Sequence, residues 1–185
     1  SADPQASLLR ARFAIDTVHR FCQSTQREPL PTADVSAAAL RAGVPSSLLE
    51  SDSHTLWRRM VDLTDRSVPA THDAYFKAWA LDGAPGLDRI ADRFLIDEAQ
   101  DNSPVADSLF AALDKPVVYV GDPSQSIYAF RGAVDTLSSF EADVTLPLSV
   151  SFRFGPAIAS LANRLLQAFK TSPLVMTGAA LADAV

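Results

Sequence analysis

FLIDE at residues 94–98 and VVYVGD at residues 117–122 decide the fold class of this chain. Each stretch is a short apolar run of the kind that forms a buried strand. Each run ends in acid, at Asp97 and Glu98 in the first and at Asp122 in the second. Ligands collect at the carboxyl ends of the strands in a parallel α/β sheet, so we expect these acids to face one crevice. For any single acid, an ordinary turn or helix-capping role is the alternative.

Strand and helix patterns alternate around these two stretches. Such alternation predicts an α/β fold in which a parallel sheet is covered by helices. We expect a third strand at residues 144–148 and helices near residues 105–113, 134–140 and 156–169. Earlier in the chain we predict a short strand at residues 13–15 that leads into a helix capped by Asp16 or Thr17.

Residues 27–69 differ in composition, being rich in proline, alanine and small polar residues, and predict a small helical insertion. Its helices are expected over residues 35–42 and 54–65, and Thr71 is expected to cap the helix that follows. The chain thus divides into residues 1–26 and 70–146, which form the main α/β body around the insertion, and residues 147–185, which begin a second unit.

The composition excludes several classes of protein. With 48% hydrophobic and 21% charged residues among 185, the chain has the composition of a globular domain. No apolar run approaches the ~20 residues of a membrane-spanning helix, so we expect no membrane association and an intracellular, cytoplasmic location. The single cysteine, Cys22, excludes an internal disulfide. The net charge of −6 excludes a uniformly basic surface, so any contact with DNA must be local.

Longer motifs extend the two acid-ended strands. DEAQD at residues 97–101 resembles motif II, and GDPSQSIYAFRGA at residues 121–133 resembles motif III, of UvrD-like superfamily 1 DNA helicases. SFRF at residues 151–154 is similar to motif IV of that family, and TVHRFC at residues 17–22 to an earlier DNA-contacting motif. THDAYFK at residues 71–77, with SFRFGPAIA, is closer to the F-box DNA helicase branch and its bacterial relatives. The resemblance implies a partial RecA-like (P-loop NTPase) sheet with helices on both faces, its second RecA-like domain beginning at residue 147.

The same resemblance implies roles in ATP hydrolysis. Asp97 would bind Mg²⁺, Glu98 would act as the catalytic base, and Gln125 would sense the γ-phosphate. Arg153 would stabilise charge that develops on the transferred phosphoryl group, a role that suits a planar, always-charged guanidinium. Phe152 would stack near the nucleotide base. Three residues would lie at or beside the nucleotide and couple it to DNA movement, namely Gln100, Asp101 and Asp122.

The motifs also imply contacts with single-stranded DNA. Tyr128 and Phe130 followed by Arg131 combine stacking faces with a phosphate-binding cation, although both aromatics also fit a core role. His72 is a second candidate, with a simple helix-start position as the alternative. Thr17 is a third, and a helix cap is its alternative.

One part of the family's machinery is absent from the sequence. The family binds phosphates with a Gly-rich loop that ends in Gly-Lys-Thr or Gly-Lys-Ser, and none of the three lysines here follows a glycine. We therefore expect an internal fragment of an ATP-dependent 3′–5′ DNA helicase or translocase, monomeric by default and inactive without the remainder of the helicase. The alternative is a naturally truncated, non-catalytic relative that binds DNA or a partner and regulates a complete helicase.

Overall fold

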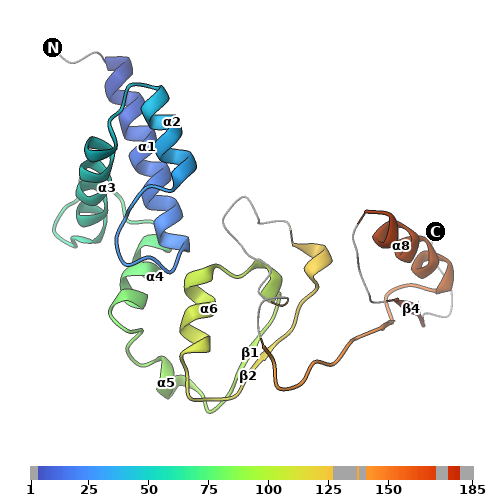
Figure 1. Cartoon of the computed structure of the whole chain (residues 1–185). Coiled ribbons are helices and arrows are strands. Elements are labelled where there is room, and N and C mark those ends of the chain that lie inside the picture. Colours follow the sequence, from blue (N-terminus) through green and yellow to red (C-terminus); the bar gives the residue numbers. More distant parts are fainter. Residues whose placement is uncertain (1–3, 127–136, 138–140, 170–174, 180–185) are drawn as a thin grey trace.

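The computed structural model describes residues 4–126, 137, 141–169 and 175–179. An N-terminal group of helices is followed by a small parallel sheet, and a separate group of elements lies at the C-terminal end (Figure 1). No helix in the described ranges is long and apolar enough to cross a membrane.

Helix α1, Pro4–Gln23, is continuous, so the strand predicted at residues 13–15 and the cap predicted at Asp16 or Thr17 are wrong. The buried side chains recur at helical spacing, on the face made by Ala14, Thr17, Val18, Phe21 and Cys22. Ile15, which suggested a strand, is 57% exposed on the outer side of the helix. The helical spacing of the buried residues therefore decides the structure here, although Phe13 and Ile15 favour a strand.

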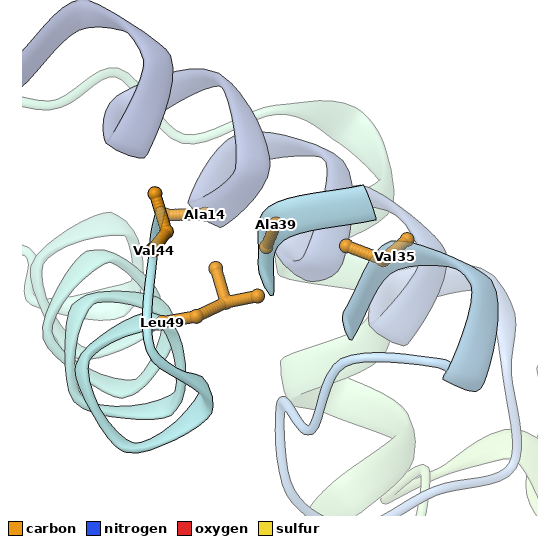
Figure 2. Close-up of a cluster of buried hydrophobic side chains, with 5 residues drawn as sticks. All are labelled: Ala14, Val35, Ala39, Val44 and Leu49. Atoms are coloured by element: carbon orange, nitrogen blue, oxygen red, sulfur yellow. The ribbon is translucent and has the colours of Figure 1, made fainter. Parts of the chain in front are cut away.

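Residues 27–69, predicted as a helical insertion, contain two helices that pack directly on α1. They are α2, Ala33–Arg41, and α3, Ser46–Val61, which begins earlier than the sequence indicated. Figure 2 shows the core that joins the three helices, with Leu49 of α3 and Ala39 of α2 both completely buried. Arg10 of α1 also forms a two-pronged ion pair with Asp52 of α3, at 2.9–3.1 Å. The insertion is thus part of the same packed unit as α1.

Helix α4, His72–Leu81, begins at the predicted cap, where the Thr71 hydroxyl accepts a hydrogen bond from the Ala74 amide at 3.2 Å. Its Lys77 is 1% exposed and reaches back to the chain just after α1. The ammonium group donates to the carbonyl oxygens of Ser24 at 2.6 Å and Gln26 at 2.7 Å, and lies 4.6 Å from the Phe21 ring centroid. Lys77 therefore links the segment that precedes the insertion to the helix that follows it.

The two acid-ended strands pair in parallel, as the sequence predicts. After the short helix α5, Leu87–Ile90, strand β1, Phe94–Ile96, lies beside β2, Val117–Tyr119, in the register Phe94 to Val117. Helix α6, Pro104–Ala111, covers one face through contact of the Phe94 and Phe110 rings, 5.7 Å apart. On the other face Leu95 and Val118 are 70% and 50% exposed. A wider sheet with helices on both faces remains a prediction.

The C-terminal elements form a second small unit. Strand β3, Val150–Ser151, pairs in parallel with β4, Thr177–Gly178, and helix α8, Pro156–Phe169, matches the predicted bounds. The Asn163 side chain exchanges two hydrogen bonds with the Met176 backbone, at 2.8 and 2.9 Å. The strand predicted at residues 144–148 is wrong, because this segment pairs with no strand among the described residues and its Val144, Leu146 and Leu148 side chains are 71–80% exposed. Apart from residue 137, the helix predicted at residues 134–140 lies outside the described residues.

Candidate functional site

The first strand end presents two adjacent carboxylates to solvent. Asp97 and Glu98 follow β1 and are exposed. Glu98 has a left-handed backbone with φ of 52°, a conformation that costs a residue with a side chain roughly 1–3 kcal/mol. Asp97 Oδ1 accepts the Glu98 amide hydrogen at 3.0 Å, which supports this sharp turn. The turn directs the chain from β1 into the 3-10 helix η1, Ala99–Asp101.

Gln100 connects the two strand ends from inside the protein. It is 1% exposed, and both ends of its amide are in use. Nε2 donates to Glu98 Oε2 at 2.7 Å, and Oε1 accepts from the Asp122 amide at 3.0 Å. The backbone continues the same link, because the Ala99 amide donates to the Val120 carbonyl at 3.0 Å. One side chain therefore contacts both of the motifs singled out in the sequence.

Asp122 extends this network into the turn after β2. It precedes the 3-10 helix η2, Pro123–Gln125, and Oδ1 accepts from the Ser124 amide at 2.8 Å. Oδ2 accepts from Gln125 Nε2 at 2.9 Å. Hydrogen bonds thus run without a break from Glu98 through Gln100 and Asp122 to Gln125. The predicted convergence of the two strand ends is present in the structure.

Gly121 is a residue of this site that the sequence reasoning quoted without giving it a role. A Cβ atom at this position would lie 2.3 Å from Gln100 Oε1, 2.9 Å from Leu137 Cδ1 and 3.1 Å from the Ala99 amide nitrogen. The absence of a side chain at Gly121 therefore makes the space that the Gln100 amide occupies. The position of Gly121, between an apolar strand and Asp122, is the feature of the sequence that could have indicated a close approach of the backbone here.

Asp101 is the last residue of η1 and is half-buried. Its Oδ1 is buried and has no hydrogen-bond partner among the described residues. Beside it in sequence, Asn102 Nδ2 donates to the buried Asp107 of α6 at 2.8 Å. Burial, followed by the nearby Asp107 charge, raises the pKa of Tyr119, the last residue of β2, to about 12, so this phenol stays neutral. This side of the strand pair is a packed layer between β2 and α6.

Arg153 and Phe152 are not brought to the carboxylates in this structure. Both follow β3 and are exposed, Phe152 by 80%. Strand β3 pairs with β4, which Figure 1 shows well apart from β1 and β2. Nucleotide contacts from these two residues would need the C-terminal unit to close on the strand ends.

The candidate DNA contacts have different environments. Thr17 lies in the middle of α1, is 1% exposed, and its hydroxyl has no hydrogen-bond partner within the described ranges, so neither capping nor direct contact with DNA occurs in this conformation. His72, the first residue of α4, is exposed and its Nδ1 contacts the Tyr75 hydroxyl. Tyr128, Phe130 and Arg131 lie outside the described residues.

The chemistry of the strand ends suits a hard divalent cation. Carboxylate oxygens are the donors that Mg²⁺ prefers, and Mg²⁺ is usually held by one or two carboxylates together with substrate phosphates and water. The described residues contain no cluster of three or more side chains that would hold a metal by themselves. Asp97, with Glu98 beside it, therefore fits a cation that arrives with a phosphate ligand.

Comparison with known proteins shows which family the sequence around the two strand ends resembles. Residues 87–145, which include β1, η1, α6, β2 and η2, match the family model of the UvrD/REP helicase N-terminal domain. The resemblance predicted from motifs II and III is confirmed, and the chain carries UvrD-like helicase sequence.

Two relatives place this sequence near the F-box DNA helicases. F-box DNA helicase 1 of Gallus gallus is 38% identical over 122 residues, which cover 64% of this chain and 12% of that protein. F-box DNA helicase protein 1 of Schizosaccharomyces pombe is 33% identical over 168 residues, which cover 88% of this chain and 19% of that protein. The chain therefore spans less than a fifth of the length of either relative.

Proposed function

We propose that this chain is the part of an ATP-dependent DNA helicase or translocase that joins the hydrolysis residues to a single-stranded DNA path. The observation that carries the proposal is the hydrogen-bonded connection from Glu98 through Gln100 to Asp122 and Gln125. It lies at the carboxyl ends of parallel strands, where ligands bind in α/β sheets, and inside the segment that matches the helicase family.

Asp97 and Glu98 are the residues we assign to the chemical step. Bound Mg-ATP would supply the phosphoryl group and a cation that neutralises charge on its oxygens. The Asp97 carboxylate would hold the cation, directly or through water. Glu98 would accept a proton from the attacking water or orient it, and the Gln100 amide bonded to Oε2 leaves Oε1 to face that water. The exposure of both acids leaves room for these ligands.

Gln125, Arg153 and Phe152 would complete the nucleotide site. Gln125 already extends from the turn after β2 and is exposed, in keeping with a role in sensing the γ-phosphate. Arg153 would add a positive charge beside the transferred group, and Phe152 would stack on the base. Because these two residues lie in the C-terminal unit, their arrival would depend on closure of that unit over β1 and β2.

The DNA contacts are proposed for residues around motif III and at the start of α4. Tyr128 and Phe130 would stack on bases beside Arg131, a contact worth about 1–3 kcal/mol for each base. His72 would approach the strand from α4. Thr17, which is buried, would support the neighbouring surface instead of touching DNA unless α1 moves. Movement in the 3′ to 5′ direction is proposed from the family alone.

The 185 residues contain no Gly-Lys-Thr or Gly-Lys-Ser loop, so we propose that they do not turn over ATP by themselves. The same feature favours a second candidate, a non-catalytic helicase-like chain that binds DNA or a partner and regulates a complete helicase. The two candidates differ in whether a longer product of the same gene hydrolyses ATP through Glu98.

The experiment that separates them measures ATP hydrolysis with and without single-stranded DNA. It compares this chain with the longest product of its gene, together with Glu98→Gln and a control, Glu50→Gln, at an exposed position on α3. DNA-stimulated hydrolysis by the longer product that is lost in Glu98→Gln alone would support the helicase. No hydrolysis by either protein would favour the regulatory candidate, and turnover by the short chain would refute our reading of the missing loop.

A further inference from the structure

The side chain of Gln100 suggests a role that its position in the sequence does not specify. A residue that binds nucleotide must reach the crevice, yet Gln100 is 1% exposed and its amide is held at both ends by protein atoms. Its donor end contacts a side chain proposed for the chemical step, and its acceptor end contacts the backbone of the neighbouring motif. The Gln100 side chain is therefore an internal brace between the Glu98 carboxylate and the Asp122 backbone.

We propose that Gln100 is a positioning residue that holds the Glu98 carboxylate in place and ties that position to the conformation of the Asp122 turn. This inference rests on the proposed function of Glu98. It assigns Gln100 no contact with nucleotide, metal or DNA.

Three observations support the brace. Glu98 is exposed, and the Gln100 amide holds its carboxylate through a hydrogen bond of 2.7 Å. The Gln100 amide is planar, so displacement of the Asp122 amide from Oε1 would turn Nε2 away from Glu98. Gly121 leaves the space for this amide, since a Cβ atom there would lie 2.3 Å from Oε1. Movement of the turn after β2 would therefore reorient the Glu98 carboxylate.

The brace would make hydrolysis depend on the turn that leads into the proposed DNA-contacting residues. Asp122 also holds Gln125 through Oδ2, so a shift of this turn would alter both the γ-phosphate sensor and the Glu98 carboxylate together. Buried polar networks of this kind are most effective when every member is satisfied, as Gln100 is here.

The test uses substitutions at Gln100 in the longest product of the gene. Gln100→Glu keeps the size and the acceptor for the Asp122 amide, but places an oxygen against Glu98 where the donor was. Gln100→Leu removes both ends, and Gln167→Leu, at an exposed position on α8, serves as the control. We expect both Gln100 variants to lower kcat by roughly 10- to 100-fold with less than about threefold change in KM for ATP, because misplacement of a catalytic group by ~1 Å has effects of this size.

Two further results would bear on the proposal. In a Glu98→Gln background, Gln100→Leu should cause no additional loss of turnover, since both changes act through the same carboxylate. The exchanged pair, Glu98→Gln with Gln100→Glu, restores a donor–acceptor pair and should recover stability lost in Gln100→Glu without recovering hydrolysis. A rise in KM with kcat unchanged, or losses that multiply with Glu98→Gln, would overturn the positioning role.

A second measurement does not depend on hydrolysis. In the 185-residue chain, the side-chain amide nitrogen resonance of Gln100 should shift when Glu98→Ala removes its acceptor at 2.7 Å, and should stay in place in the control Glu50→Gln. An unresponsive resonance would overturn the brace itself. If the wild-type gene product is inactive while the resonance responds, the proposed function fails and the contact between Glu98 and Gln100 stands.

Discussion

Replacement of Lys77 by methionine tests the buried link between α4 and the segment that follows α1. Methionine keeps an unbranched apolar stem beside Phe21 and removes the ammonium group that binds the Ser24 and Gln26 carbonyls. Hydrogen bonds to charged groups contribute about 1.5–3 kcal/mol each before offsets, so two would give roughly 3–6 kcal/mol. Burial lowers the pKa of Lys77, which shows that the charge is held against a desolvation cost. The freed carbonyls lie near the surface and can bind water, so we expect a net loss of about 2 kcal/mol.

The assay is urea unfolding followed by circular dichroism at a helix wavelength. With a denaturant slope of about 2 kcal/mol per molar, a loss of this size lowers the midpoint by about 1 M. Lys115→Met is the matched control, because Lys115 makes one carbonyl hydrogen bond, to Ala91 at 2.7 Å, and its side chain is 25% exposed. It should lose less than about 1 kcal/mol. Equal midpoints for wild type and Lys77→Met, or equal losses in the two variants, would refute the reasoning.

Three other perturbations follow from the structure. Thr71→Ala removes the cap of α4 and should cost about 1 kcal/mol in the same unfolding assay, whereas an unchanged midpoint would show that the cap contributes nothing. Burial raises the pKa of Cys22 from 9.0 to about 12, so the stability that the neutral thiol contributes is complete below pH 9 and is lost as pH rises toward 12. A thiol reagent at pH 8 should therefore label Cys22 only after urea unfolds the chain. Rapid labelling of the folded chain would contradict this. Gly121→Ala should destabilise the chain by about 2 kcal/mol and shift the Gln100 side-chain resonance, while Gly43→Ala, where nothing lies within 4 Å, should leave that resonance in place.

The sequence predicts the parallel strands and helix α8 because local and tertiary preferences agree there. The apolar runs that form β1 and β2 end in acids, and a parallel pairing places those acids at one edge. Helix α8 has proline in its first turn and its apolar residues repeat at helical spacing. Short-range patterns were sufficient for these elements.

The errors occur where packing decides between two local preferences. Phe13 and Ile15 favoured a strand, but Ala14, Thr17 and Val18 complete a helical face that packs on α2, α3 and α4. Residues 144–148 have strand-type composition, but they pair with no strand in the part of the chain that the structure describes. A segment forms a strand only when it pairs with a neighbouring strand, so the composition of residues 144–148 alone gives the wrong prediction.

Motifs II and III single out Glu98, Gln100 and Asp122 as candidates, and the structure places these three residues in one hydrogen-bonded network. Their functional roles stay predictions. The burial of Gln100 and its two-ended contact depend on the approach of η1 to the turn after β2, which no single segment encodes. Lys77 was missed for the same reason, because its partners lie more than fifty positions away in the chain.

The left-handed backbone of Glu98 has a consequence for the evolutionary record of this position. Glycine adopts this conformation without strain and asparagine with little, so drift under selection for folding alone would replace Glu98 with one of these residues. In lineages where the proposed chemistry has been abandoned, position 98 should change early, while Gly121, whose Cβ would also crowd Leu137 and the Ala99 backbone, should persist. The order in which the two residues are lost would then date the loss of hydrolysis relative to the loss of structure.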